Sequence, residues 1–476
     1  MSKLLPRFAP LTAILLAGCM VGPNYHRPSA LVPGKYKEMP GWAQAAPADA
    51  APKGTWWTGF DDPLLDQLEP QVSVSNETVR ASLANYMQAR ALVQEAEGQL
   101  FPTLGISGSA SRARAGSTYG SPSIASSAAL SGTASWQLDL WGQIRRSVQE
   151  SAATAQEAQA TLANATLAEQ TLLATDIVDL RVSDAQINLL QQTVKAYQEA
   201  LRITMNQGAA GVAAPSDVIT ARATLEAAQS SLINAGIARA ESEHAIAVLV
   251  GRLPEDLSVP ASKYLPTLPT IPVGVPSTLL ERRPDIAAAE RSMAAANAAI
   301  GVAVAAYYPT ITLSAAGGFS ASPIGALFSV ANQVWSLGTA AAVDLFNGGA
   351  RSAAVQAARD AYEATIATYR GDVLTAFQQV EDQLVALRIL AQQEVVETAA
   401  VKDAAQAVQI ALNEYQAGTA AYTTVTTAQA TLLTDQETVL SIRAQRLLAS
   451  VTLIEDLGGG WSASELSGPP APDILP

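Results

Sequence analysis

The chain repeats itself once, and this internal duplication limits its fold more than any other feature of the sequence. Phe101-Pro102-Thr103 recurs as Tyr308-Pro309-Thr310, 207 residues further on. So many matches in one register indicate a tandem duplication of about 190 residues. The single residues that recur at this offset include Lys195 and Lys402, Asn206 and Asn413, Gly211 and Gly418, Val218 and Val425, Thr220 and Thr427, and Gly251 and Gly458.

The duplication divides the chain into segments. The first repeat covers 71–265 and the second covers 277–460, and a proline-rich linker at 266–276 joins them. The prolines of the linker favour an extended, semi-rigid chain. A signal segment at 1–18, an N-terminal segment at 19–70 and a C-terminal tail at 461–476 complete the predicted organisation.

Each repeat contains the same order of predicted elements. A helix comes first, and Pro102 or Pro309 should end it. A Gly/Ser-rich β-hairpin follows, whose weak alternation is typical of outer-membrane strands. A very long helix comes next. The predicted ranges in the two repeats are 76–99 and 284–306 for the first helix, 103–140 and 310–346 for the hairpin, and 147–207 and 352–416 for the long helix.

The long helices are too long for an ordinary globular core, since 60 residues reach about 90 Å. After short loops at 208–216 and 418–424, a second long helix returns in each repeat. Its apolar residues are spaced by three and four, which predicts an antiparallel coiled-coil pair. The predicted seam residues are Val218, Ala221, Leu225, Ala228 and Leu232, and in the copy Val425, Ala428, Leu432, Val439 and Ile442.

The N-terminus resembles a bacterial lipoprotein signal. Lys3 and Arg7 precede an apolar stretch at 8–17 that is too short to span a bilayer. Leu16-Ala17-Gly18-Cys19 then resembles a lipobox, in which Cys19 becomes the lipid-modified N-terminus. Cys19 is the only cysteine, so no disulfide forms within the chain. Met20 stands where an aspartate would resemble an inner-membrane retention signal, which favours the outer membrane.

Charge and hydropathy restrict the surroundings of the protein. The formal net charge of −13 argues against a nucleic-acid partner. No stretch after the signal has 18 consecutive uncharged apolar residues, so any membrane crossing must use β-strands. Four strands cannot close a barrel, which predicts that several chains close one together. The aromatic residues near the strand ends form either an interfacial girdle or packing contacts with the adjoining helices: Trp136, Trp141, Trp335 and Phe346.

The sequence offers little that could perform chemistry. His26 and His244 are the only histidines, and neither has a partner at metal-ligand spacing. Neither a P-loop nor a nucleophile elbow is present in the sequence. We therefore expect no enzyme activity, no metal site and no cofactor apart from the lipid on Cys19.

Four stretches resemble the NodT branch of the outer-membrane factors of RND-type efflux systems, which are TolC-type channels. The resemblance covers nearly the whole chain after the signal. The stretches are Cys19-Met20-Val21-Gly22-Pro23-Asn24-Tyr25-His26-Arg27-Pro28, Trp56-Trp57-Thr58-Gly59-Phe60-Asp61-Asp62-Pro63-Leu64, Leu279-Leu280-Glu281-Arg282-Arg283-Pro284-Asp285-Ile286 and Leu457-Gly458-Gly459-Gly460-Trp461.

The resemblance implies a mainly α fold with a membrane β-barrel. Three chains would form a twelve-stranded barrel in the outer membrane and a helical tunnel through the periplasm. It also implies a periplasmic adaptor and an inner-membrane RND-type transporter as partners, and passive export of small molecules. From the residues alone, Arg282, Arg283, Pro284 and Asp285 are interpreted as structural, with Pro284 starting a helix and Asp285 in its first turn.

The same resemblance predicts where a gate would lie, at the two turns that contain Gly211 and Gly418. Asp217 matches an acidic linker and Tyr415 matches a tyrosine linker that hold such channels closed. Asp217 could instead cap a helix, and Tyr415 could instead be a seam residue. The usual basic partner is replaced by Ala420, and the acidic ring of relatives maps to Ala420, Thr424 or Thr427. Since none of these is charged, closure should depend mainly on packing.

Two other functions are compatible with the sequence. A structural coiled-coil lipoprotein would have long helices but no membrane-crossing strands, and the two matching hairpins argue against it. An exit duct for protein secretion would share the architecture.

Overall fold

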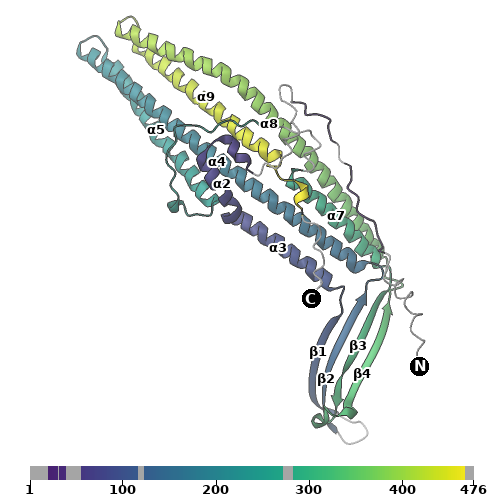
Figure 1. The fold of residues 1–476 in the computed structure, drawn as a ribbon. Helices are drawn as coiled ribbons and strands as arrows, with labels where there is room; N and C mark the ends of the chain where they lie inside the picture. Colours follow the sequence, from purple (N-terminus) through teal and green to yellow (C-terminus); the bar gives the residue numbers. More distant parts are fainter. Residues whose placement is uncertain (1–19, 30–31, 39–54, 116–122, 272–281, 467–476) are drawn as a thin grey trace.

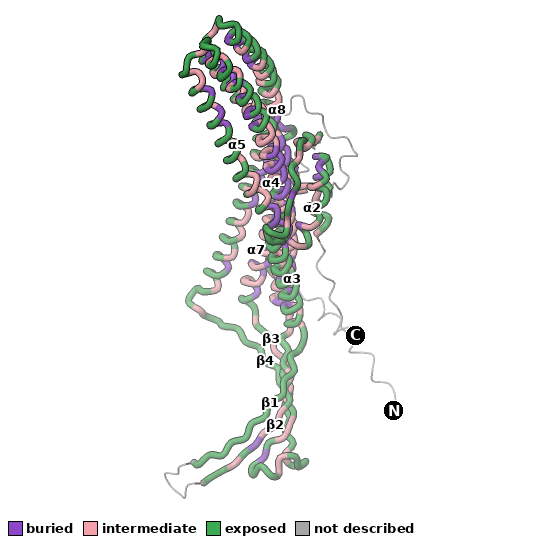
Figure 2. Tube along the Cα trace, turned by 90° about the vertical axis from the view of Figure 1, so that its left-hand side faces the viewer, coloured by how far each residue is buried: buried purple, intermediate pink, exposed green. Residues whose placement is uncertain are grey.

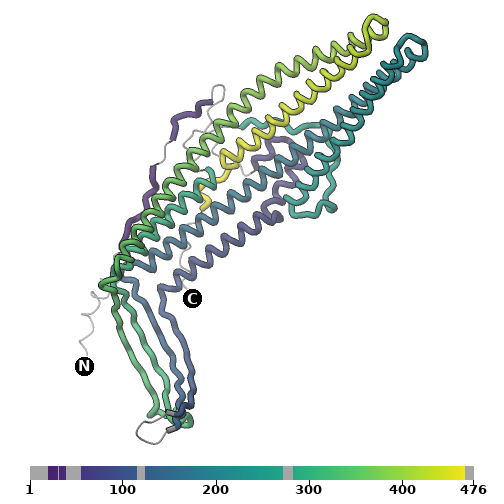
Figure 3. The backbone as a smooth tube through the Cα atoms, turned by 180° about the vertical axis from the view of Figure 1, so that it is seen from behind, coloured from purple at the N-terminus to yellow at the C-terminus, as the bar shows by residue number. Residues whose placement is uncertain are grey.

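The structure is a computed structural model, and it describes residues 20–29, 32–38, 55–115, 123–271 and 282–466. The signal segment, Cys19, part of the linker and the end of the C-terminal tail lie outside these residues. The described chain is an elongated molecule, with long helices at one end and a small sheet at the other (Figure 1). The N-terminal segment runs along α8 (Ala350–Gln416), where the Arg27 guanidinium donates to the Tyr369 hydroxyl at 3.0 Å (Figure 3).

The two repeats fold into matching elements. The corresponding helices have equal lengths of 22, 67 and 35 residues. The first repeat consists of α3 (Glu77–Gly98), β1 (Thr103–Ala115), β2 (Ser123–Leu138), α4 (Gln143–Ala209) and α5 (Pro215–Leu249). The second consists of α7 (Pro284–Ala305), β3 (Thr310–Ala321), β4 (Gln333–Ala342), α8 and α9 (Tyr422–Asp456).

The long helices form two antiparallel pairs. α4 packs against α5, and α8 packs against α9. A helix of 67 residues spans about 100 Å. The turns of both pairs lie side by side at the end of the molecule that is farthest from the sheet, as Figures 1 and 3 show. The predicted seam residues are all buried or half-buried, which confirms the coiled-coil spacing.

The four strands form one antiparallel sheet in the order β1-β2-β3-β4. Each repeat contributes one hairpin, and the pairing of β2 with β3 joins the two hairpins. β1 and β4 are therefore the two edges of the sheet. The fold class is as predicted: mainly helical, with four strands in each chain.

The hydrophobic core lies in the middle of the helical part, where Figure 2 shows the buried positions concentrated. Two ion pairs with buried carboxylates lie at this level. The Arg181 guanidinium lies 2.8 Å from the Asp62 carboxylate, and Arg239 lies 2.7 Å from Asp184. Removing one partner of such a pair leaves an uncompensated buried charge and costs about 3–5 kcal/mol. The core includes Trp57, Phe60, Leu173, Ile177, Leu180, Ile286, Met293, Tyr369, Val380, Leu384 and Leu453.

Helix α2 (Pro63–Ser75) was not predicted. Its start signal is present in the sequence, because Asp62 accepts hydrogen bonds from the backbone N–H groups of Leu64 and Leu65, and Pro63 is the first helical residue. Pro70 lies inside the helix and argues against predicting one here, since proline usually ends a helix. Five short 3-10 helices were also not predicted: η2 (Trp56–Phe60), η3 (Pro254–Asp256), η5 (Ile324–Ala326), η6 (Val330–Asn332) and η7 (Ala463–Glu465).

The long helices and the helices that return after them begin earlier than predicted, whereas α3 and α7 agree with their predicted ranges to within one residue. α4 begins four residues before the predicted start and continues to Ala209, and α5 begins at Pro215. The turns therefore span only 210–214 and 417–421. The reason is that Pro215 and Tyr422 already take helical conformations as the first residues of the returning helices.

Candidate functional site: a two-faced sheet and a helical tip

The sheet has one apolar face and one polar face. Alternate residues of a strand point to opposite faces, and the register places residues of one kind together. Leu104 lies opposite Ala134, which lies opposite Ala315 and then Leu337. The apolar face carries Leu104, Ile106, Ile124, Leu130, Trp136, Ile311, Leu313, Phe319, Trp335 and Leu337. The polar face carries Thr103, Ser107, Ser109, Ser111, Ser127, Ser131, Thr133, Ser135, Thr310, Thr312, Ser314 and Ser336, with Val334 as an exception.

The apolar face is exposed in a single chain. Leu104 is 81% exposed, Ile106 80% and Leu337 76%. The edge strands β1 and β4 are exposed, whereas many residues of β2 and β3 are half-buried between them (Figure 2). On the polar face, the Ser107 and Ser131 hydroxyls form a hydrogen bond at 3.0 Å. An exposed apolar surface of this extent indicates contact with a membrane or with another protein chain.

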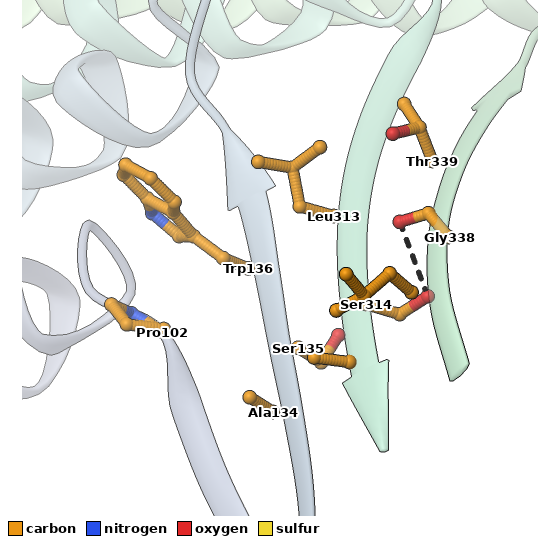
Figure 4. Close-up of a pocket in the computed structure, with 10 residues that line it drawn as sticks. Pro102, Ala134, Ser135, Trp136, Leu313, Ser314, Gly338 and Thr339 are labelled. Carbon is orange, nitrogen blue, oxygen red and sulfur yellow. Dashed lines mark hydrogen bonds between the residues drawn. The ribbon is translucent and has the colours of Figure 1, made fainter. Parts of the chain in front are cut away.

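The sheet end that adjoins the helices contains a shallow depression. Figure 4 shows Trp136 and Leu313 pointing into it, while the Ser314 hydroxyl donates to the Gly338 carbonyl at 3.4 Å. The Trp136 indole N–H donates to the Leu100 carbonyl at 2.9 Å. This hydrogen bond fixes the indole between the sheet and the end of α3.

The second tryptophan at this level packs against protein. The Trp141 indole donates to the Pro309 carbonyl at 2.9 Å, and its ring stacks on Tyr308 with centroids 4.9 Å apart. The packing interpretation is therefore confirmed for Trp141. Trp335 and Phe346 are 76% and 89% exposed in the single chain, so their place in an interfacial girdle stays a prediction.

The residues that follow Cys19 are held at this same junction of helix and sheet. The Val21 N–H donates to the Trp141 carbonyl at 3.1 Å, and the buried Arg146 guanidinium donates to the Val21 and Gly22 carbonyls at 3.0 and 3.1 Å. Gly22 packs on Gly301 so closely that a Cβ atom on Gly22 would lie 2.5 Å from the Gly301 Cα. This clamp was not predicted, because its parts are far apart in the sequence.

The two helical turns at the far end have the same geometry. Gly211 and Gly418 adopt φ values of +75° and +73°, a region that glycine enters without strain. The Val212 N–H donates to the Gln207 carbonyl, and the Thr419 N–H donates to the Glu414 carbonyl, each at 2.9 Å. These bonds satisfy carbonyls at the helix ends in the manner of a Schellman motif.

A small apolar cluster lies just behind these turns, and we call it the tip cluster: Ala221, Ala411, Tyr415, Tyr422 and Val425. The Tyr415 and Tyr422 rings are 5.1 Å apart. Leu201 of α4 and Ala213 of the first turn also pack against the cluster. The cluster therefore joins the first helical pair to the second. Tyr422 was not predicted to take part.

The capping interpretation of Asp217 is wrong. The N-cap position of α5 is occupied by Ala214, which makes no side-chain cap, and Asp217 lies in the first turn because Pro215 is already helical. The buried Tyr415 hydroxyl instead lies near Thr204 and Asp217, but it makes no well-formed hydrogen bond within the described chain. Burial raises the pKa of Tyr415, a contact with Thr204 lowers it, and the charge of Asp217 raises it again.

The other candidate tip residues carry no charge, and the structure leaves them accessible to different degrees. Ala420 is half-buried, and Thr424 and Thr427 are exposed. The Thr427 hydroxyl donates to the Thr423 carbonyl of its own helix at 2.9 Å. Contact between the two pairs at this end is therefore mostly apolar.

The Arg282–Asp285 motif joins the two ends of the second repeat. Arg283 precedes α7, and its guanidinium lies 2.6 Å from the Asp285 carboxylate and 3.4 Å from Asp456 at the end of α9. Burial raises the pKa of Asp456 to about 7, although Arg283 opposes the rise. A Cβ atom on Gly458 would lie 2.1 Å from the Arg282 carbonyl oxygen, which explains why glycine stands there.

Two kinds of feature are absent from the residues that the structure describes. None of the described helices is both long enough and apolar enough to cross a membrane. Within the same ranges, His, Cys, Asp and Glu side chains form no group that could hold a metal ion.

Solved structures define the class of this fold. The outer-membrane channel OprN has a TM-score of 0.86 with this chain at 28% sequence identity, over 93% of this chain and 100% of OprN. The fold is therefore that of an outer-membrane channel subunit. The family model described as "Outer membrane efflux protein" matches residues 69–252 and 275–459, and the chain belongs to this family.

Curated relatives agree with this assignment. A probable efflux pump outer membrane protein, TtgC of Pseudomonas putida, is 31% identical over 461 residues, which is 95% of this chain and 94% of TtgC. Nodulation protein T of Rhizobium leguminosarum bv. trifolii is 30% identical over 392 residues, 80% of this chain and 81% of that protein. The resemblance to NodT-type outer-membrane factors is confirmed.

Proposed function

We propose that this chain is the outer-membrane exit duct of a tripartite efflux pump, and that it exports small molecules passively. The observation that carries the proposal is the sheet with one apolar and one polar face, joined to helices of 67 residues. The apolar face suits lipid contact and the polar face suits a water-filled path. The helices would continue this path for about 100 Å into the periplasm.

The sheet is the reason to propose a trimer. β1 and β4 are free edges, and an open sheet edge is not tolerated in lipid. Pairing β4 of one chain with β1 of the next would remove both edges. Three chains would give a closed sheet of twelve strands, and the number three comes from the family resemblance.

We also propose that lipid on Cys19 anchors the chain in the inner leaflet of the outer membrane. The support is the clamp that holds Val21 and Gly22 where the sheet meets the helices. Cys19 is two residues from Val21, so a lipid on Cys19 would start close to this level. The anchor would be on the periplasmic side of the membrane, where lipoprotein lipids insert.

The tip cluster is proposed as the gate. Tyr415 and Tyr422 of the second pair pack beside Ala213 and Ala221 of the first, and Asp217 lies near the Tyr415 hydroxyl. Movement of one pair away from the other would break these contacts and open the path. Gly211 and Gly418 would let the turns keep their shape during this movement, and Ala420 and Thr424 would face the passing solute without charge.

The duct would work with a periplasmic adaptor and an inner-membrane RND-type transporter, which supplies the energy. It would perform no chemical reaction itself, and it would need no cofactor. Relatives named for toluene, solvent and antibiotic efflux support small apolar molecules as cargo.

The experiment is to determine the mass of the purified oligomer and its single-channel conductance in planar lipid bilayers. A trimer with a small, cation-selective conductance is expected, because the tip contacts would keep the path narrow and the chain carries an excess of acidic residues. A monomer without conductance would contradict the proposal and favour a purely structural lipoprotein.

A further inference from the structure

We propose that Arg112 and Arg114 form a binding surface for the phosphate groups of lipids in the outer leaflet of the outer membrane. The inference rests on the proposed function, because it takes the sheet to lie in that membrane. Both arginines are exposed and lie near the end of β1 that is farthest from the helices. In the register, Arg112 lies opposite Ser126 and Arg114 lies opposite Ile124.

Both arginines belong to the apolar face. They are separated from Leu104 and Ile106 by even numbers of residues along one strand, so their side chains leave the same side of the sheet. A charged residue on a surface that contacts lipid needs a specific reason. Arginine at the centre of the bilayer costs about 2–4 kcal/mol, and this cost falls to about 0–1 kcal/mol near the interface.

Arg112 lies at the depth expected for the membrane interface on the side away from the helices. Trp136 and Leu313 lie two residues before the level of Leu104, and Leu138 and Ile311 lie two residues nearer the helices on the same face. We take Trp136, whose indole is hydrogen-bonded to Leu100, as the interfacial residue on this side. From the level of Trp136 to Arg112 the strand extends by ten residues, about 34 Å. A strand tilt of about 40° reduces this to about 26 Å across the membrane, close to the 25 Å of an outer-membrane apolar band. Arg114 lies a further two residues out, at the level of lipid headgroups.

The charged residues of the four strands are all positive. Residues 98–138 contain no acidic residue, and residues 292–343 contain no charged residue at all. Arg112 and Arg114 are thus the only charged side chains of all four strands, in a chain whose net charge is −13. No ion pair within the described residues includes either arginine.

Phosphate is the group that suits this surface. A guanidinium donates paired hydrogen bonds to a phosphate, and such charge-assisted bonds are strong. The source of the phosphate is a lipid and not a soluble ion, because the arginines continue the apolar face that contacts acyl chains. A closed trimer would carry six such guanidinium groups around its outer rim.

The test compares lipid binding by the purified native trimer and by the double variant Arg112→Gln/Arg114→Gln. The probes are lipid A that carries both of its phosphates and the same lipid with its phosphates removed, measured by native mass spectrometry. The native trimer should prefer the phosphorylated lipid at least tenfold, and the double variant should lose this preference. Arg80→Gln, an exposed arginine of α3 paired with Glu77, is the matched control and should keep it.

Inorganic phosphate at millimolar concentration should not displace the lipid; displacement by phosphate alone would show that the site binds a free anion, and would overturn the lipid assignment. A double variant that keeps the full preference would overturn the role of the arginines. Oligomer mass and conductance are measured on the same samples. Normal conducting trimers without a phosphate preference would refute this inference alone, whereas absence of trimers and conductance would refute the proposed function.

Discussion

An arginine placed at Ile106 should destabilise the assembled trimer strongly, whereas the same residue at Ser109 should not. Ile106 is on the apolar face, level with Gly132, Gly317 and Trp335, and its side chain is 80% exposed in the single chain. Ser109 is three residues further along the same strand, on the polar face opposite Ala129. The two variants therefore add the same charge to opposite sides of one strand.

The size of the difference follows from the membrane. An arginine near the middle of the lipid face costs about 2–4 kcal/mol, and a trimer carries three copies, so Ile106→Arg should cost about 6–12 kcal/mol per trimer. On the polar face, Ser109→Arg points into water and should cost less than about 1 kcal/mol per chain, as expected of an exposed substitution.

The assay is refolding of urea-denatured protein into lipid vesicles, with the fraction of trimer followed by gel mobility as urea is raised. Ile106→Arg should lower the urea midpoint clearly or prevent assembly, and Ser109→Arg should remain near the native midpoint. Equal effects of the two variants, or a larger effect of Ser109→Arg, would refute the assignment of the faces.

Three further predictions concern the helical part. Burial raises the pKa of Glu69 to about 9, and neither carboxyl oxygen has a partner in the described chain. Its folded-state pKa thus exceeds the unfolded value, so the free energy of unfolding is highest below about pH 4.5 and falls by about 1.4 kcal/mol per pH unit up to pH 9. Glu69→Gln should abolish this pH dependence, so between pH 6 and pH 8 the native protein should lose about 3 kcal/mol in free energy of unfolding that the variant keeps. Thermal unfolding at pH 6 and pH 8 checks this, and equal changes in the two proteins would contradict it. Tyr415→Ala and Tyr422→Ala should each raise the open fraction of single channels several-fold, since each removes a ring from the apolar contact between the helical pairs, and Asp217→Ala tests the charge beside it; an unchanged open fraction in all three counts against the gate. Gly458→Ala should lower stability by about 1–3 kcal/mol, because φ is +87° and the Cβ atom would meet the Arg282 carbonyl, while Gly98→Ala, with open space around it, should not; calorimetry distinguishes the two.

The repeated architecture could be predicted because its signals are local and occur twice. Heptad spacing, the Phe101-Pro102 and Tyr308-Pro309 breaks and the glycines of the turns each have a direct effect on nearby backbone. The two faces of the sheet were harder to predict. Strands rich in Gly, Ala and Ser alternate weakly, and only the pairing register shows that Leu104 and Leu337 share a face.

The parts that sequence reasoning missed depend on contacts between distant segments. Arg146 reaches Gly22 across 124 residues, and no local pattern marks such a pair. The location of the tip was predicted, but the contacts between its residues were not. Asp217 looked like a cap because it is near a helix start, yet Pro215 moves that start two residues earlier. Tyr422 was missed because its partner Tyr415 lies across a turn, on another helix.

In the proposed duct, solute enters at the tip, passes through the helical tunnel and leaves along the polar face of the sheet. The most direct test is the current through single Thr424→Cys trimers before and after a bulky thiol reagent is added on the side of the helices. Thr424 is exposed in the first helical turn of α9, next to the tip, so modification should reduce the current at least several-fold, while the unsubstituted protein should be unaffected. An unchanged current after complete labelling, verified by mass, would contradict a path through the tip.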